Sequence, residues 1–323
     1  MIKIAAILAY TPLVHNHSVP NSLMHNLLLN RPKDSELYLY YYPQPIVSAE
    51  ILQNDIALLK PKQTKEIKIT PMASGVKAKL KNAKQRIIKT DNDQLPPIVH
   101  QYMPDNDVLD ELKQIQPDAI VMFPYWLIHW AKQLHQFNVV VSATDSGSLH
   151  FLRAVKAVSW KNANELNSYL SNFQSYIKLE TEWGKTNARL QMVGKADMKH
   201  LLNVNHQKLN IFYAPHPYND FIPIQQTLDK VTEKINLLVT GVADSVYFAN
   251  HFSTFVDLLI TNKNLSKHYQ LVFIGSGYED YVIRLTDAGY QITHHKWVED
   301  FSKALAQCQL QLFPLAVGTG TKG

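Results

Sequence analysis

Cysteine is almost absent from this sequence, because Cys308 is the only one among 323 residues. A single thiol excludes an internal disulfide, and it also excludes a zinc site built on paired cysteines. A reducing, cytoplasmic compartment fits this composition. The sequence also lacks any run of about 18 to 20 apolar residues, which is the length that a membrane-spanning helix needs.

The phosphate-binding motif Gly-x-Gly-x-x-Gly does not follow the first apolar segment, Met1–Tyr10. Its absence argues against a nicotinamide-dependent dehydrogenase. In outline the same segment is similar to a secretory signal peptide, but its basic region is only Lys3 and no small-residue cleavage site follows. We therefore interpret it as a buried first strand.

Apolar runs alternate with amphipathic stretches along the chain, which is the pattern of a parallel sheet covered by helices on both faces. The second half repeats this rhythm after a polar segment, Tyr218–Lys234. We expect an α/β protein with two doubly wound domains: residues 1–217, a linker at 218–234, and residues 235–323. In the first half we expect strands at Ile2–Tyr10, Leu37–Tyr42, Ile67–Ile69, Ala119–Phe123, Val139–Ser142 and Ile211–Ala214, helices at Pro20–Leu29, Ser74–Lys89, Asp105–Ile115 and Trp126–Leu134, and a helical region from Ser148 to about Leu202. In the second half we expect strands at Ile235–Thr240, Gln270–Ile274, Tyr290–His294 and Leu310–Phe313, and helices at Phe248–Ile260, Glu279–Ala288 and Asp300–Cys308.

Four ordered segments of the second half carry a resemblance to a known family. They are Ile235–Gly241, Leu271–Gly277, Trp297–Asp300 and Leu312–Gly323. Together they resemble the nucleotide-sugar domain of the retaining glycosyltransferases grouped as family 4. Asp145-Ser146 and Ile211–Pro217 extend the resemblance more loosely into the first half.

The resemblance implies the GT-B fold, in which two Rossmann-like domains with parallel sheets face a cleft. It implies an enzyme, a hexosyltransferase that moves a sugar from a UDP- or GDP-linked donor to a glycan or lipid-linked acceptor. Retention of configuration and independence of a metal or other cofactor are also implied. We place the acceptor in residues 1–217 and the donor in residues 235–323.

The donor diphosphate needs backbone N–H groups and a positive charge, and glycines let the backbone approach it closely. The final segment supplies Gly318, Thr319, Gly320, Thr321 and Lys322. We predict that this loop holds the diphosphate; the alternative is a surface turn. The resemblance adds three donor residues, namely Gly241, Trp297 and Val298, with the base near the last two.

On the acceptor side, Asp145 follows a buried strand at the edge where such sheets bind ligands. The resemblance implies that Asp145 faces the transferring sugar, and the alternative is an N-cap for the helix that begins near Ser148. His150 and Arg153 follow about one turn later and are candidates for the same side. His15 and His17 are candidates to contact a phosphate or hydroxyl, although a polar loop is the simpler interpretation.

Two departures from the family pattern favour a second hypothesis, a non-catalytic GT-B-like partner of another enzyme. The family has an arginine after the glycine that ends its opening strand, whereas Val242-Ala243-Asp244-Ser245 follows Gly241 here. The paired glutamates of the family would lie beyond Gly323, so the resemblance implies that the sequence is incomplete at its C-terminal end.

Ten basic residues lie between Lys60 and Lys89, where Glu66 is the only opposing charge before the aspartates that follow. We expect the helix Ser74–Lys89 to dock on an anionic membrane at the inner face or on an anionic acceptor; the alternative is a solvated helix face. Aromatic residues are not interleaved there, which argues against nucleic acid.

Two further patterns have simple interpretations. The Asp-x-Asp patterns at Asp91–Asp93 and Asp105–Asp107 are interpreted as turns and caps rather than as a metal site. For Tyr125, Trp126 and Trp130 the alternatives are an acceptor contact and core packing.

Overall fold

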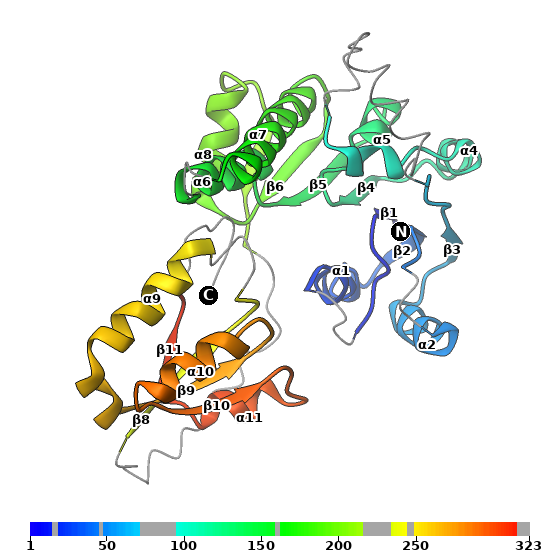
Figure 1. Cartoon of the computed structure of the whole chain (residues 1–323). Coiled ribbons are helices and arrows are strands. Elements are labelled where there is room, and N and C mark those ends of the chain that lie inside the picture. Colours follow the sequence, from blue (N-terminus) through cyan, green and yellow to red (C-terminus); the bar gives the residue numbers. More distant parts are fainter. Residues whose placement is uncertain are drawn as a thin grey trace. The chain divides into compact units, whose positions relative to one another are not determined.

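A computed structural model describes residues 1–14, 19–44, 48–71, 95–158, 162–215, 234–243 and 249–314. The chain divides into two compact units. Unit 1 contains the described residues within Met1–Leu149 and Ser171–Asn219. Unit 2 contains the described residues within His150–Leu170 and Asp220–Gly318, of which Pro314 is the last. Each unit is an α/β structure with its own parallel sheet (Figure 1).

Unit 1 is built on a seven-stranded sheet in the order β3-β2-β1-β4-β5-β6-β7. The strands are β1 (Ile2–Leu8), β2 (Ser35–Tyr41), β3 (Gln63–Glu66), β4 (Ala119–Phe123), β5 (Val139–Thr144), β6 (Arg189–Met192) and β7 (Ile211–Tyr213). All neighbouring strands pair in parallel. The helices of unit 1 are α1 (Val19–Leu29), α2 (Ala49–Leu59), α4 (Asn106–Ile115), α5 (Ile128–Gln133) and α8 (Lys195–Val204), together with the start of α6 (Gly147–Ala157) and the part of α7 (Ala163–Trp183) that follows Leu170.

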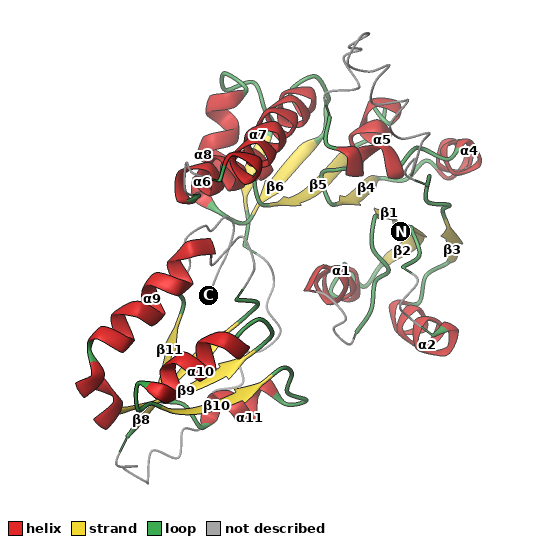
Figure 2. Cartoon of the chain, in the orientation of Figure 1, coloured by secondary structure: helices red, strands yellow, loops and turns green. Residues whose placement is uncertain are grey.

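Side chains of β1 alternate between the two faces of this sheet, as the pleat of a strand requires. Ala5 and Ile7 belong to a core cluster that includes α4, α5, α7 and α8, whereas Ala6 and Leu8 belong to a second cluster with α1 and α2. Helices therefore cover both faces (Figure 2), and burial on both sides explains why β1 is a continuous apolar run.

Unit 2 has a four-stranded sheet in the order β10-β9-β8-β11. The strands are β8 (Ile235–Thr240), β9 (Tyr269–Ile274), β10 (Gln291–His295) and β11 (Leu310–Leu312), and the helices are α9 (Ala249–Thr261), α10 (Glu279–Asp287) and α11 (Phe301–Ala306). One core cluster joins the sheet to α9 and α10. A smaller cluster of Leu238, Ile274 and Cys308 lies on the α11 side, and Cys308 is only 4% exposed there.

The prediction of an α/β fold with parallel sheets flanked by helices is confirmed. Asp105 caps α4 as predicted, since its carboxylate accepts the N–H of Val108 at 3.2 Å. The predicted strand at Ile67–Ile69 is wrong, because β3 is Gln63–Glu66. Residues 148–202 are not helical throughout, since β6 interrupts them, and α2 was not predicted at all.

Among the described residues, no helix combines the length and the apolarity that crossing a membrane requires.

Candidate functional site

Open parallel sheets bind ligands outside the carboxyl ends of their strands, where the strand order reverses. In unit 1 this reversal lies between β1 and β4, and in unit 2 it lies between β8 and β11. Each unit therefore has its own candidate ligand-binding edge.

Aromatic side chains gather at the reversal point of unit 1. The ring of Tyr10, just after β1, lies 5.7 Å from that of Phe123 and 6.0 Å from that of Trp126. Trp126 in turn stacks on Tyr102 at 6.4 Å. Tyr10 and Trp126 are half-buried, so part of each ring faces solvent. Half-buried rings of this kind can contact the apolar face of a ligand.

For Tyr125, Trp126 and Trp130 the sequence left two alternatives, an acceptor contact and core packing. Core packing is confirmed for Tyr125 and Trp130. Trp130 is fully buried and donates its indole N–H to Tyr42 Oη at 2.9 Å, and Tyr125 is 4% exposed. Trp126 alone of the three reaches the surface. Tyr10, its partner at this edge, lies at the end of an apolar strand, and nothing in the sequence distinguishes it from a core residue.

The loop after β1 is anchored by buried polar groups. Asn21, which is fully buried, donates its amide N–H groups to Thr11 O at 2.6 Å and to Gln44 Oε1 at 3.0 Å. Asp55 on α2, 7% exposed, accepts the N–H of Val14 at 2.8 Å. These contacts hold the entry to the segment that carries His15 and His17. Both histidines lie outside the described residues.

The turn after β5 presents Asp145, which is half-buried, at the carboxyl edge of unit 1. Thr144 before it has a φ of 62°. The next three backbone N–H groups are each held by a different side chain: Ser146 donates to Asp197 Oδ1 at 2.9 Å, Gly147 to Tyr125 Oη at 2.8 Å, and Ser148 to Glu180 Oε1 at 3.1 Å. This turn therefore has its backbone fixed from three directions.

Ser146 caps α6, because its hydroxyl accepts the N–H of Leu149 at 3.1 Å. Gly147 is required by its surroundings, since a Cβ there would overlap the ring of Tyr176 and Tyr125 Oη. His150 and Arg153 lie further along α6 and are half-buried, and the ring of His150 contacts Phe151 at 5.1 Å.

Glu180 on α7 is the most perturbed acid near this turn. Its side chain is 1% exposed, and burial raises its pKa from 4.5 to about 7, while hydrogen bonds from Ser148, Ser146 and Tyr125 oppose the rise. The sequence did not reveal Glu180 or Asp197, because each is an ordinary acidic residue in an amphipathic helix.

In unit 2, the loops after β8, β9 and β10 interlock through their backbones. Gly241 N–H donates to Ile274 O at 3.0 Å, and Gly275 N–H donates to His295 O at 2.8 Å. Gly275 has a φ of +138°, and a Cβ there would overlap the carbonyl oxygen of Gly241. The two glycine segments that the sequence singled out separately therefore touch each other at this carboxyl edge.

The loop between β10 and α11 carries the two residues that the resemblance places near the base. Trp297 is 74% exposed, whereas Val298 packs against the cluster of Leu238, Ile274 and Cys308. Val242, after Gly241, is 49% exposed at the position where the family has an arginine. Gly318, Thr319, Gly320, Thr321 and Lys322 lie outside the described residues.

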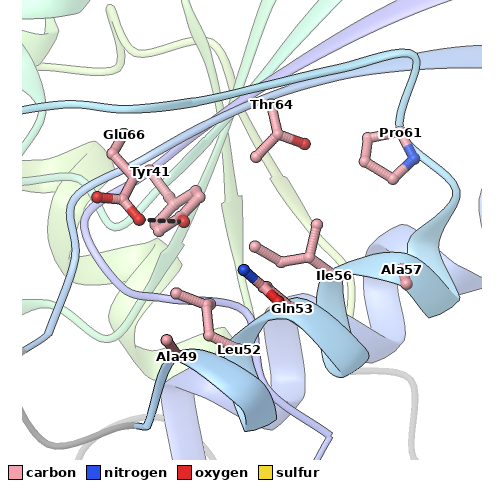
Figure 3. Close-up of a pocket in the computed structure, with 9 residues that line it drawn as sticks. All are labelled: Tyr41, Ala49, Leu52, Gln53, Ile56, Ala57, Pro61, Thr64 and Glu66. Carbon is pink, nitrogen blue, oxygen red and sulfur yellow. Dashed lines mark hydrogen bonds between the residues drawn. The ribbon is translucent and has the colours of Figure 1, made fainter.

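The described part of each unit also contains a cavity. One of 410 Å³ in unit 1 lies between α2 and the strands β2 and β3, where Tyr41 Oη donates to Glu66 Oε1 at 2.8 Å (Figure 3). The other, of 450 Å³, lies in unit 2 at the start of α10, and Gly277, Glu279 and Arg284 are among its lining residues.

Part of the basic segment is neutralised within the fold. Lys62 pairs with Glu36 at 2.7 Å and Lys65 with Glu111 at 2.6 Å. These acids come from β2 and α4, so the charge balance of the segment alone overstated its positive charge. The stretch Ser74–Lys89 lies outside the described residues.

No protein-family profile matches the sequence, and no curated protein matches it. Solved structures do match its fold. The apo form of the lipopolysaccharide outer core galactosyltransferase WaaB has 11% identity and a TM-score of 0.53, over 95% of this chain and 71% of that one. WaaG, a glycosyltransferase involved in lipopolysaccharide biosynthesis, has 14% identity and a TM-score of 0.52, over 97% of this chain and 75% of that one.

The N-terminal domain of the Candida albicans trehalose-6-phosphate phosphatase also matches, with 11% identity and a TM-score of 0.55, over 99% of this chain and 79% of that one. The fold of this chain is therefore that of the GT-B glycosyltransferases. Because one of these three structures is named for a phosphatase, the fold by itself does not fix the reaction.

Proposed function

We propose that this chain is a glycosyltransferase that moves a sugar from a nucleotide-sugar donor to a glycan or lipid-linked acceptor. One observation carries the proposal: a glycine-built carboxyl edge on unit 2 accompanies a polar and aromatic carboxyl edge on unit 1, in a chain with the GT-B fold. A donor and an acceptor each need such an edge.

Unit 2 suits the donor. The close backbone contact of Gly241 with Gly275 leaves no side chain between the two loops. Exposed Trp297 offers a ring for a nucleotide base. The loop Gly318–Lys322 would supply N–H groups, hydroxyls and one charge for the diphosphate of a UDP- or GDP-linked sugar, with no metal.

Unit 1 suits the acceptor. Asp145 would hydrogen-bond the acceptor hydroxyl or stabilise the positive charge that develops on the transferring sugar. The half-buried rings of Tyr10 and Trp126 lie at the same sheet edge, where β1 and β4 end. Retention of the anomeric configuration, and docking of Ser74–Lys89 on an anionic membrane at the cytoplasmic face, belong to the same proposal.

A second candidate is a GT-B-like partner that binds a nucleotide-sugar without turnover. Val242 favours it, because an exposed valine cannot neutralise a phosphate where the family has an arginine.

The test is calorimetric titration of the full protein with UDP, GDP, ADP and CMP. We expect one nucleotide to bind, and Lys322→Ala to weaken it about tenfold, the loss of about 1.4 kcal/mol expected for one charged contact. Lys267→Ala is the matched control. Lys267 is an exposed lysine in the turn before β9, at the amino end of that strand, whereas the candidate ligand edge lies at its carboxyl end.

If the protein then releases free sugar from a sugar-linked form of the bound nucleotide, or transfers that sugar to an acceptor, the enzyme is supported. Binding without any turnover supports the non-catalytic partner. If a folded protein binds none of the four nucleotides, both candidates fail.

A further inference from the structure

Glu180 is a buried carboxyl, and three of its four hydrogen bonds come from the turn that presents Asp145. Its Oε1 accepts the hydroxyl of Ser146 at 2.9 Å and the N–H of Ser148 at 3.1 Å, and its Oε2 accepts the hydroxyl of Ser148. Tyr125 Oη is the most distant donor, at 3.5 Å. The four groups that donate to Glu180 are neutral. When Glu180 is ionised, its buried negative charge is therefore stabilised by these hydrogen bonds.

This arrangement occupies the N-terminal end of α6. Backbone N–H groups at the start of a helix attract anions, and here the chain's own carboxyl groups, on Glu180 and Asp197, accept them. The first turn of α6 is therefore bound to α7 and α8 rather than open to a phosphate. Asp145 directly precedes these anchored residues.

The titratable groups around Glu180 come from several elements. Tyr125 follows β4, Asp145 lies on the turn, Tyr176 is on α7, and Asp197 and His200 are on α8. Ser148 Oγ lies 2.7 Å from His200 Nε2. Ser148 Oγ therefore connects Glu180 to His200 through hydrogen bonds.

We propose that Glu180 is a positioning residue, whose protonation state sets how firmly the Ser146–Ser148 turn, and with it Asp145, is held at the sheet edge. Protonated Glu180 needs no charge stabilisation in its buried site, so the closed turn is favoured. Ionised Glu180 is better solvated when the turn opens, so loss of the proton favours opening. The link to sugar transfer rests on the proposed function, whereas the link to the turn does not.

The test measures hydrogen exchange of the Ser146–Leu149 amides between pH 5 and 8, corrected for the intrinsic effect of pH on exchange. In the natural protein we expect protection to fall as pH rises, by up to about tenfold per pH unit until the pH reaches about 7. Glu180→Gln mimics the protonated acid, so its protection should be independent of pH. Ser148→Ala removes a hydrogen bond that favours the ionised form, so it should move the fall in protection to higher pH.

Glu182→Gln is the matched control, because Glu182 lies on the same helix and is only 9% exposed, but pairs with Lys132 and Lys185. It should leave the pH dependence of the turn unchanged. If the active protein is assayed, kcat should fall as pH rises to about 7 and then level off, and this fall should be absent from Glu180→Gln, with an unchanged KM for the donor.

A Glu180→Gln variant that keeps the pH-dependent protection would overturn the proposal, and so would a Ser148→Ala variant with an unshifted transition. If the exchange results are as expected and no transferase activity is found, the positioning role stands and the proposed function fails.

Discussion

Gly275→Ala should destabilise unit 2 by about 3 kcal/mol, the sum of backbone strain at a positive φ and the overlap of the new methyl group with Gly241 O. The overlap cannot be relieved by a side-chain rotation, because the opposing atom is backbone. Urea unfolding followed by circular dichroism measures the loss, and hydrogen exchange in β8, β9 and β10 assigns it to unit 2. Nucleotide binding should weaken in the same variant, since Gly241 is displaced.

Gly289→Ala separates the two causes. Gly289 has a φ of +91°, but the nearest atom to an added Cβ is Ser266 Oγ at 3.7 Å, an ordinary contact. This control should therefore lose only about 1 kcal/mol, from backbone strain alone. Equal losses in the two variants would show that the contact with Gly241 has no energetic weight.

Glu180→Gln should stabilise the protein at pH 8, although it replaces a fully hydrogen-bonded buried group. The pKa of Glu180 is about 7 in the folded protein against an ordinary value of 4.5. A raised folded-state pKa contributes stability that is present below pH 4.5 and is lost as pH rises to about 7. The loss is about 3 kcal/mol for a shift of this size.

The measurement is the difference in unfolding free energy between Glu180→Gln and the natural protein at pH 5 and at pH 8. The difference should be small at pH 5 and should favour the variant by about 2 kcal/mol at pH 8, after about 1 kcal/mol for an amide hydrogen without an acceptor. Glu182→Gln should instead be destabilising at pH 8, because it removes the ion pairs that Glu182 makes with Lys132 and Lys185. If the difference in unfolding free energy between the variant and the natural protein is the same at pH 5 and at pH 8, the raised pKa is contradicted.

Much of the fold could be predicted because strands that are buried on both faces are continuous apolar runs in the sequence. The predicted strand Ile235–Thr240 coincides with β8, and most predicted helices differ from the observed ones by a few residues. The edge strand β3 was placed wrongly because its residues, Gln63–Glu66, are polar. β6 has only four residues, and its helical surroundings concealed it.

The candidate site was predictable only where local sequence carries the signal. The segments of Gly241 and Gly275 were singled out through their resemblance to a nucleotide-sugar domain, but the contact between the two glycines is made through space and has no signature along the chain. Glu180 lies 35 positions from Asp145, and its role depends on burial that only the packing of α7 against the turn creates. Asn21 and Asp55 were missed for the same reason.

Alkylation of Cys308 can be used to measure how often unit 2 opens. Its sulfur is packed between α11 and the sheet of unit 2, and burial raises the pKa of its thiol. Alkylating reagents act on the exposed thiolate, so they can modify Cys308 only in molecules whose second unit has opened. Because the sequence has no other thiol, the rate of modification reports the opening of unit 2 alone. Opening of the seven-stranded unit 1 does not contribute to it.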